Sequence, residues 1–168
     1  AYFDVITGKT AILFAAAAAA GAKLAGANDD DVAVMHDYGL QLGLAFQIMD
    51  DAMDYGVSSS AMGKNTGDDF IDQQITLPVI LAWQDGDAND REFWQRTIGD
   101  GNFADGDLAT AQAILASHDA IDRSIETAGN YANAAIAALS RLSSPNQSQV
   151  PIIAALEAAA RFSAARQN

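Results

Sequence analysis

An acidic, proline-free stretch at residues 32–57 dominates the first third of this sequence. Its apolar residues recur with helical spacing, which predicts one long α-helix. Within it, Gln47, Asp50, Asp51 and Asp54 stand at positions i, i+3, i+4 and i+7. Side chains with this spacing lie on one face of a helix. The sequence therefore predicts a helix that presents one amide and three carboxylates on a common face.

Three carboxylates this close together repel one another, at a cost of about 0.2–0.5 kcal/mol for each like-charged pair on an exposed helix. No Lys or Arg lies between Lys23 and Lys64 to neutralise them. A divalent cation would relieve the repulsion, and Mg²⁺ is commonly bound by one or two carboxylates together with phosphate oxygens of a substrate. A solvated acidic face is the alternative, and the spacing alone does not separate the two interpretations.

Two glycines, Gly39 and Gly43, lie on the same face of this helix, N-terminal to Gln47. A glycine inside a helix costs about 1 kcal/mol relative to alanine, so the pair indicates that something must fit against the helix there. We expect an open wall without side chains, deeper than the carboxylates. A second stripe of the helix is expected to lie in the core: Met35, Leu42, Phe46, Met49 and Met53.

The composition limits the classes of function. The chain has 168 residues, enough for one domain with a hydrophobic core. Its formal net charge is −13, from 22 acidic and 9 basic residues, which argues against nucleic-acid binding because no basic stripe can replace phosphate counterions. The absence of cysteine excludes a disulfide scaffold and a thiolate zinc site. His36 and His118 are too far apart in the sequence to suggest a histidine metal cluster.

The apolar, alanine-rich run at residues 11–25 is too short to cross a bilayer, with Lys9 before it and Lys23 inside it. We therefore expect no transmembrane segment and no signal peptide, and a location in the cytoplasm. The alanines at residues 15–20 predict a smooth helix surface that a second helix can approach closely. The chain starts without methionine and enters a helix at once, so we expect it to be part of a longer protein.

The expected fold is all-α, with six or seven helices and no strand-like alternation. One helix begins at Thr76, with Pro78 in its first turn and Trp83 in the core. A short amphipathic helix carries Phe93 and Trp94. The other expected helices span residues 3–25, 32–57, 107–117, 121–142 and 150–166.

Two lysines are candidate phosphate contacts. Lys9 and Lys64 each follow a glycine, but both positions lack the earlier glycine of a phosphate-binding loop. An ordinary surface lysine is therefore the alternative for Lys9. Lys64 lies in a polar loop at residues 63–69 that could fold over the acidic face and supply a counter-charge to a diphosphate bound there through metal.

Taken together, these residues resemble the trans-isoprenyl (polyprenyl) diphosphate synthases. The order and spacing of the motifs match over roughly residues 2–82, and the C-terminal helices match more loosely. The motifs that carry the resemblance are Lys9-Thr10, Tyr38-Gly39-x-x-Leu42-Gly43-x-Ala45, Phe46-Gln47-x-x-Asp50-Asp51-x-x-Asp54-Tyr55, Gly63-Lys64-x-x-Gly67-Asp68 and Thr76-Leu77-Pro78.

The resemblance implies an all-α bundle around a deep hydrophobic cavity, with two Asp-rich motifs that hold Mg²⁺ ions on an allylic diphosphate at its mouth. It implies that residues 1–168 are the C-terminal part of a single isoprenoid synthase-like domain. The metal ligands implied here are Asp50, Asp51 and Asp54, the second Asp-rich motif. The implied catalytic residues are Asp50, Asp51 and Lys9, and the implied substrate-binding residues are Lys9, Thr10, Gln47 and Lys64.

The activity implied by the resemblance is prenyl transfer. An allylic diphosphate loses its diphosphate, isopentenyl diphosphate attacks the resulting carbocation, and loss of a proton leaves a longer trans-polyprenyl diphosphate. The resemblance also implies a homodimer. The chain length of the product does not follow from these residues.

Two departures from the family pattern matter. The family's N-terminal helices, with the first Asp-rich motif, are missing from these residues, so the isolated 168-residue chain is expected to be inactive. Where the family usually has Gly-Lys before x-Thr-Leu-Pro, this chain has Gln73-Gln74, which removes one positive charge. The alternative function is therefore a catalytically weak regulatory or binding subunit of a heteromeric prenyl synthase.

Overall fold

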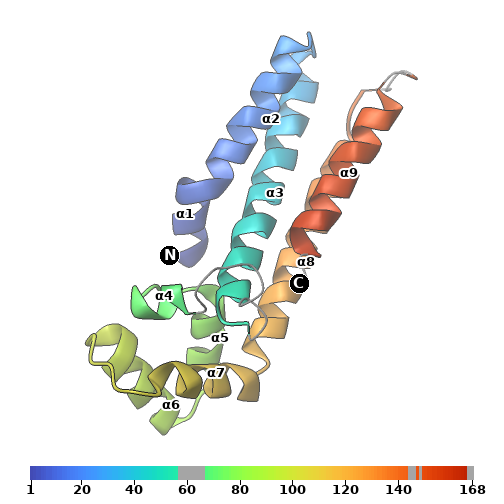
Figure 1. The fold of residues 1–168 in the computed structure, drawn as a ribbon. Helices are drawn as coiled ribbons and strands as arrows, with labels where there is room; N and C mark the ends of the chain where they lie inside the picture. The colour runs from blue at the N-terminus through green and yellow to red at the C-terminus, as the bar shows by residue number, and fades with distance from the viewer. Residues whose placement is uncertain (57–66, 144–146, 148, 166–168) are drawn as a thin grey trace. The chain divides into compact units, whose positions relative to one another are not determined.

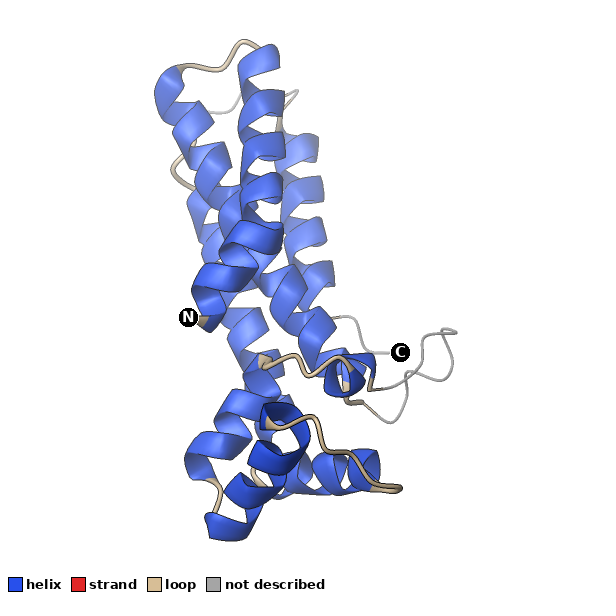
Figure 2. Cartoon of the chain, turned by 90° about the vertical axis from the view of Figure 1, so that its left-hand side faces the viewer, coloured by secondary structure: helices blue, strands red, loops and turns tan. Residues whose placement is uncertain are grey.

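The structure is a computed structural model that describes residues 1–56, 67–143, 147 and 149–165. The described residues form helices, turns and loops but no strand, which confirms the all-α fold (Figure 2). The chain divides into two compact units. Unit 1 comprises Phe3–Met49 together with the chain from Glu126 onward, and unit 2 comprises Asp50–Ile125 together with Tyr2.

Unit 1 is a bundle of long helices, and α2, α3 and α9 run side by side in Figure 1. The predicted first helix is present, but a π-helical segment divides it. The elements are α1 (Tyr2–Ile6), the π-helical segment η1 (Thr7–Ala11), α2 (Ile12–Leu24), α3 (Asp29–Asp54), α8 (Ala120–Leu139) and α9 (Val150–Ala164). The ends of α3 and α8 extend into unit 2.

The space beside the two glycines of α3 is filled by the backbone of the neighbouring helix. A Cβ added at Gly39 would stand 2.4 Å from the carbonyl oxygen of Phe14, and one added at Gly43 would stand 2.6 Å from Ala11 Cα. Ala11 and Ala15 are fully buried at this contact. The predicted close approach of a second helix to the alanine run at residues 15–20 is confirmed at Ala15, whereas Ala16, Ala17 and Ala20 are exposed. The prediction of an open wall at the glycines is wrong, because the missing side chains make room for a helix backbone.

The core of unit 1 is built from small and aromatic side chains on α3, α8 and α9. Tyr38 is buried, and its hydroxyl donates to the carbonyl oxygen of Leu156 at 2.8 Å, which joins α3 to α9. Of the five residues predicted to form the core stripe of α3, Met49 is buried and the other four are half-buried. The fully buried positions follow a neighbouring stripe instead: Tyr38, Ala45, Ile48, Met49 and Ala52.

Unit 2 consists of short helices around an aromatic core. After the end of α3 come α4 (Asp68–Ile71), α5 (Leu77–Asp85), α6 (Ala88–Trp94), the π-helical segment η3 (Gln95–Gly99) and α7 (Asp107–Ser117). The largest buried side chains of its core are Tyr55, Phe70, Trp94, Ile98 and Leu115. Pro78 lies in the first turn of α5, as predicted, but the side chain of Thr76 makes no capping hydrogen bond.

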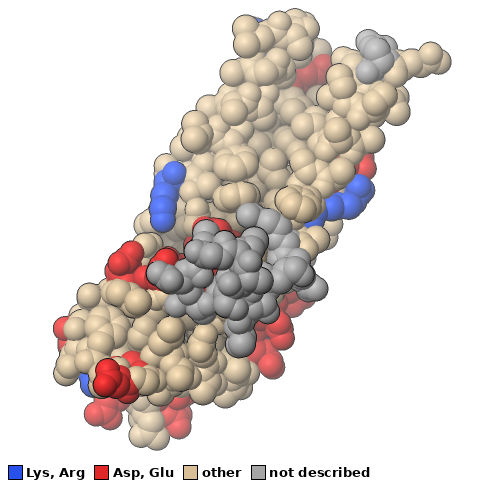
Figure 3. Space-filling view, in the orientation of Figure 1, with Lys and Arg blue, Asp and Glu red and all other residues tan. Residues whose placement is uncertain are grey.

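One ion pair stabilises the middle of unit 2. The Arg96 guanidinium donates to both oxygens of Asp107, at 2.8 and 2.7 Å. The backbone N–H of Ala104 donates to the same carboxylate at 2.6 Å. The hydrogen bonds from Arg96 and Ala104 hold the pKa of Asp107 below its usual range. On the face shown in Figure 3, acidic side chains predominate over basic ones, in agreement with the formal net charge of −13.

The helical run Tyr2–Leu24 is long and apolar enough to span a membrane, judged by length and composition alone. The prediction of no transmembrane segment considered only residues 11–25, whereas the whole run passes this test, which core helices of soluble proteins also pass. Ala11 and Ala15 pack this run against α3, and Thr10 donates a hydrogen bond to Gln47 of α3. Apart from Tyr2, the run belongs to unit 1.

Candidate functional site

Helix α3 continues without a break to Asp54, so the predicted acidic face lies on regular helix. Its polar side chains are not fully solvated. Gln47 and Asp51 are only 8% and 5% exposed, and Asp50 and Asp54 are half-buried. Burying a charged group is costly unless it is paired or hydrogen-bonded. The low exposure of Asp51 therefore favours a binding site over a solvated acidic face.

Asp51 has a partner that the sequence did not reveal. The hydroxyl of Tyr2 donates to Asp51 Oδ2 over 2.6 Å, across 49 positions of the chain. Burial, followed by the charge of Asp51 and this hydrogen bond, raises the pKa of Tyr2 above its usual value. Tyr2 therefore stays a neutral donor at physiological pH. No motif around Tyr2 signals this contact, since the two residues meet only through the fold.

Asp54 is held by the start of α4. Its Oδ2 accepts from the backbone N–H of Asp69 at 3.0 Å, and its backbone carbonyl accepts from Gly67 at 2.9 Å. Gly67 has a φ of 88°, a conformation that favours glycine, and it lets the chain turn from there into α4. Burial is the largest influence on the Asp54 carboxyl and raises its pKa.

The buried hydroxyls of Tyr55 and Thr76 lie close to each other, near these carboxylates. Tyr55 and Thr76 are 1% and 5% exposed. Burial raises the pKa of Tyr55, and the charge of Asp69 raises it further.

The described residues contain no group of three carboxylates or imidazoles close enough to hold a metal ion by themselves. Asp50, Asp51 and Asp54 therefore do not form a complete cation cage on their own. This agrees with the ligand chemistry of Mg²⁺, which usually keeps several waters or phosphate oxygens in its shell.

Two of the predicted substrate-binding residues of unit 1, Lys9 and Thr10, lie on the π-helical segment η1, and the third, Gln47, lies on α3. Thr10 Oγ1 donates to Gln47 Oε1 at 2.6 Å, which brings together two of the predicted residues. Lys9 is exposed on the same segment. Single π-helical turns inside α-helices frequently occur at functional sites. Lys64, the remaining predicted residue, lies outside the described residues, as does most of its loop.

Gln73 and Gln74, the two glutamines expected to replace a Gly-Lys pair, are exposed. Gln73 has a φ of 57°, so its backbone has the left-handed conformation that favours glycine. Gln74 does not share that conformation, and its N–H donates to the carbonyl oxygen of Asp69 at 2.8 Å. The backbone of this turn is thus the one that a glycine would adopt most easily.

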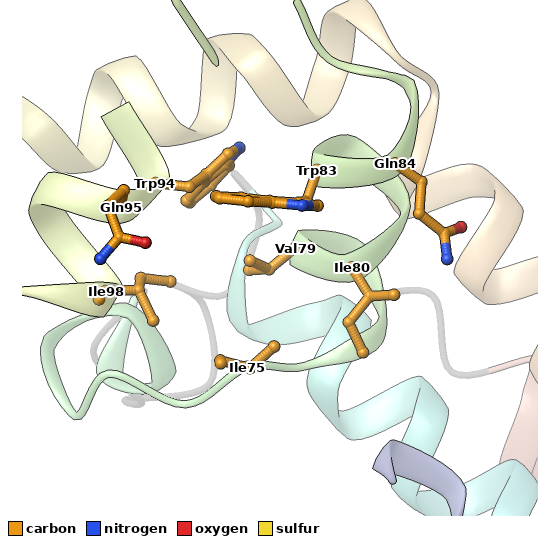
Figure 4. Close-up of a pocket in the computed structure, with 9 residues that line it drawn as sticks. Ile75, Val79, Ile80, Trp83, Gln84, Trp94, Gln95 and Ile98 are labelled. Carbon is orange, nitrogen blue, oxygen red and sulfur yellow. The ribbon is translucent and has the colours of Figure 1, made fainter. Parts of the chain in front are cut away.

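Unit 2 also has an apolar groove of about 370 Å³ that the sequence did not predict. Figure 4 shows Trp83 and Trp94 along one side of it and Ile75 on the opposite side. Trp83 was predicted to be core, yet it is 40% exposed, because it lines this groove. The other lining residues are Val79, Ile80, Gln84, Gln95, Ile98 and Gly99, and none of them is a predicted site residue.

The chain is similar to prenyl synthases both in sequence and in structure. The family model described as polyprenyl synthetase matches residues 1–115. Octaprenyl diphosphate synthase of Haemophilus influenzae is 35% identical over 138 residues, which cover 82% of this chain and 42% of the relative. Geranylgeranyl diphosphate synthase of Sulfolobus acidocaldarius is 32% identical over 150 residues, covering 89% and 44% of the two chains.

Among solved structures, a polyprenyl synthase from Caulobacter crescentus CB15, complexed with calcium and isoprenyl diphosphate, matches with a TM-score of 0.90 and 40% identity. The match covers 99% of this chain and 49% of that one. A decaprenyl diphosphate synthase from Rhodobacter capsulatus matches with a TM-score of 0.88 and 40% identity, covering 99% and 50%. This chain therefore spans about half the length of the relatives it matches.

Proposed function

Because this chain belongs to the polyprenyl synthetase family, we propose that it is part of a prenyltransferase that condenses an allylic diphosphate with isopentenyl diphosphate. The product is a longer trans-polyprenyl diphosphate. We further propose that residues 1–168 are the C-terminal part of one isoprenoid synthase-like domain. The observation that carries the proposal is the acidic face of α3, where a nearly buried Asp51 and a half-buried Asp54 stand beside Asp50.

We assign Asp50, Asp51 and Asp54 to the binding of Mg²⁺ together with the diphosphate. Carboxylate oxygens are the ligands that this hard cation prefers, and the incomplete donor set leaves positions for phosphate oxygens. The calcium and isoprenyl diphosphate in the Caulobacter relative support a site for a divalent cation and a diphosphate in this fold. When bound, the metal supplies Lewis-acid stabilisation of the departing diphosphate.

The remaining proposed contacts belong to the diphosphate. Lys9 and Lys64 supply positive charge to its oxygens, and Thr10 and Gln47 line the site beside Lys9. The hydrogen bond from Thr10 fixes the Gln47 amide, so that its NH₂ group keeps one orientation. In the reaction the allylic C–O bond breaks and releases diphosphate, the double bond of isopentenyl diphosphate attacks the resulting carbocation, and the new chain loses a proton to the released diphosphate. Lys9 would neutralise part of the negative charge of the departing diphosphate, and Asp50 and Asp51 would act on it through the metal that they hold.

A binding experiment tests the metal assignment. Calorimetry of Mg²⁺ with the protein alone should give weak binding, because three carboxylates on one helix cannot fill an octahedral shell. Adding a thiolo analogue of an allylic diphosphate should strengthen the binding of Mg²⁺, and Asp50→Asn should abolish that gain. Tight Mg²⁺ binding without the analogue would contradict the assignment. The isolated 168-residue chain should show no prenyl transfer, whereas the intact protein should show it.

A second candidate function is a catalytically weak regulatory or binding subunit of a heteromeric synthase. The observation that favours it is Gln74, which stands where the family usually has a lysine and is exposed to solvent. The two functions differ in a simple assay. An intact protein that makes no prenyl diphosphate alone, but raises the activity of a partner synthase, would establish the second function.

The proposed assembly is a homodimer of the intact protein, located in the cytoplasm. The first helical run exposes several large apolar side chains, with Val5 at 62%, Ile12 at 47% and Leu13 at 70%. Surface of this kind is typical of a protein contact. Sedimentation at micromolar concentration tests the dimer, and a monomer alone would argue against it.

A further inference from the structure

We propose that Tyr2 is a positioning residue for the metal-binding carboxylate of Asp51. The inference rests on the proposed function, since it assigns a role toward the cation held by the acidic face of α3. It concerns a residue outside the acidic motif itself, which reaches that motif only through the fold. Tyr2 acts on Asp51 and not on the substrate.

The contact has the geometry of a strong hydrogen bond. The Tyr2 hydroxyl donates to Asp51 Oδ2 at 2.6 Å. Hydrogen bonds from a hydroxyl to a carboxylate are short and about twice as strong as those between neutral groups. Asp51 is 5% exposed, so water competes little for this oxygen. The bond therefore restrains the rotation of the Asp51 carboxylate about its last torsion.

Tyr2 is itself held in place. It is half-buried, and its phenol oxygen interacts with the backbone N–H of Leu77, in the first turn of α5. The phenol thus lies between the Asp51 carboxylate and the beginning of another helix. Because the Tyr2 hydroxyl is held in one position, it also holds the Asp51 carboxylate in one orientation, as the outer-shell partners of metal ligands do.

A merely structural role is the alternative, in which Tyr2 anchors the first turn of α1. Tyr38 offers a matched comparison on this point. It is a buried tyrosine whose hydroxyl also makes one hydrogen bond across helices, but to the carbonyl oxygen of Leu156 and not to a carboxylate. Removing either hydroxyl costs a hydrogen bond, whereas only the loss at Tyr2 touches a proposed metal ligand.

The test uses the intact protein and two variants, Tyr2→Phe and Tyr38→Phe. Mn²⁺ affinity is measured by electron paramagnetic resonance in the presence of geranyl thiolodiphosphate. Loss of an outer-shell partner typically weakens metal binding 10- to 100-fold, so Tyr2→Phe should lower the Mn²⁺ affinity by about that factor. Tyr38→Phe should leave it within about twofold, while both variants lower the melting temperature. In the assay, Tyr2→Phe should require more Mg²⁺ for half-maximal activity.

A second measurement does not depend on the stability of a variant. In protein labelled with fluorotyrosine, adding Mg²⁺ with the same analogue should shift the ¹⁹F resonance of Tyr2 more than that of Tyr38. Equal Mn²⁺ affinities of Tyr2→Phe and the unsubstituted protein, equal losses in both variants, or an unmoved Tyr2 resonance on metal binding would overturn the inference alone. Failure of the unsubstituted protein to bind Mn²⁺ with the analogue would overturn the proposed function, and this inference with it.

Discussion

Gly43 of α3 lies so close to Ala11 of η1 that a Cβ at Gly43 would stand 2.6 Å from Ala11 Cα. A distance this short leaves no room for the side chain of any other amino acid, and the obstacle is backbone that cannot rotate aside. The segment next to Ala11 carries Lys9 and Thr10, and Thr10 bonds to Gln47 one helical turn beyond Gly43. The glycine thus sets the distance between the two elements that hold the predicted residues of unit 1.

We predict that Gly43→Ala lowers the free energy of unfolding by about 1–3 kcal/mol, the usual cost of overpacking a core. Gly129→Ala is the matched control, since a Cβ at Gly129 of α8 meets nothing within 4 Å. That variant should stabilise the protein by about 0.5–1 kcal/mol, because alanine is the better helix former. Denaturant unfolding measures both. The same sign for the two variants would contradict the close helix contact.

The left-handed backbone at Gln73 predicts a second pair of opposite effects. The left-handed conformation costs a residue with a Cβ about 1–2 kcal/mol. This cost exceeds the loss of stability that glycine causes through the greater conformational entropy of the unfolded chain. Gln73→Gly should therefore raise the free energy of unfolding by about 0.5–1 kcal/mol. Gln74→Gly should lower it by a similar amount, because the neighbouring backbone is not left-handed. Thermal melts of the two variants give the answer, and a loss of stability in Gln73→Gly would show that its side chain matters more than its backbone.

Acid titration of stability should separate two aspartates. The pKa of Asp107 is lowered, chiefly by the hydrogen bond from Arg96, so its contribution is present above the unfolded pKa of about 3.9 and disappears as the pH falls through the folded pKa. Asp107→Asn should lower the melting temperature at pH 7, and the difference should shrink below about pH 4.

Asp54 should behave in the opposite way in chelator-treated protein. Burial raises its pKa, so the ionised carboxylate destabilises the fold above that pKa and the cost fades as acid protonates it. Asp54→Asn should then raise the melting temperature at pH 7. Equal pH profiles for Asp107→Asn and Asp54→Asn would contradict the opposite pKa shifts.

The periodicity of the sequence was sufficient to predict the longer helices and the acidic face of α3, because both depend on local spacing, but it did not predict the short α4 or the π-helical segments. It was not sufficient to interpret Gly39 and Gly43. A glycine pair shows that something approaches closely, but only the fold shows that the neighbour is the backbone of Phe14 and Ala11. The same limit applies to Trp83, since an apolar pattern does not reveal which buried face is left open as a groove.

The same limit applies to the candidate site, where some features follow from local sequence and others follow only from the fold. The Asp-rich spacing and the nearby Thr10 belong to motifs that can be recognised in one stretch of chain. The hydrogen bonds from Tyr2 to Asp51 and from Asp69 to Asp54 join residues 49 and 15 positions apart, and no local pattern contains them. The chemistry of the ligands was therefore predictable, whereas the groups that orient them were not.

The last prediction concerns the charge missing at Gln74. The side chain is exposed, and the backbone of the turn is held by the hydrogen bond to Asp69, so a lysine fits there without rearrangement. A charge-assisted hydrogen bond is worth about 1.5–3 kcal/mol against about 0.5–1.5 for a neutral one, and the difference of about 1–2 kcal/mol corresponds to roughly five- to thirty-fold.

Gln74→Lys in the intact protein should therefore lower the Michaelis constant for the allylic diphosphate, or raise turnover, by about that factor. Gln84→Lys is the control, because it adds the same charge at another exposed glutamine of unit 2 and should change neither constant. Steady-state kinetics at saturating Mg²⁺ measure both variants. Unchanged kinetics for Gln74→Lys in an active protein would show that this side chain does not meet the diphosphate. If the natural protein is inactive and gains activity only as Gln74→Lys, the regulatory-subunit function is favoured. The missing positive charge at position 74 would then be the main defect of its site.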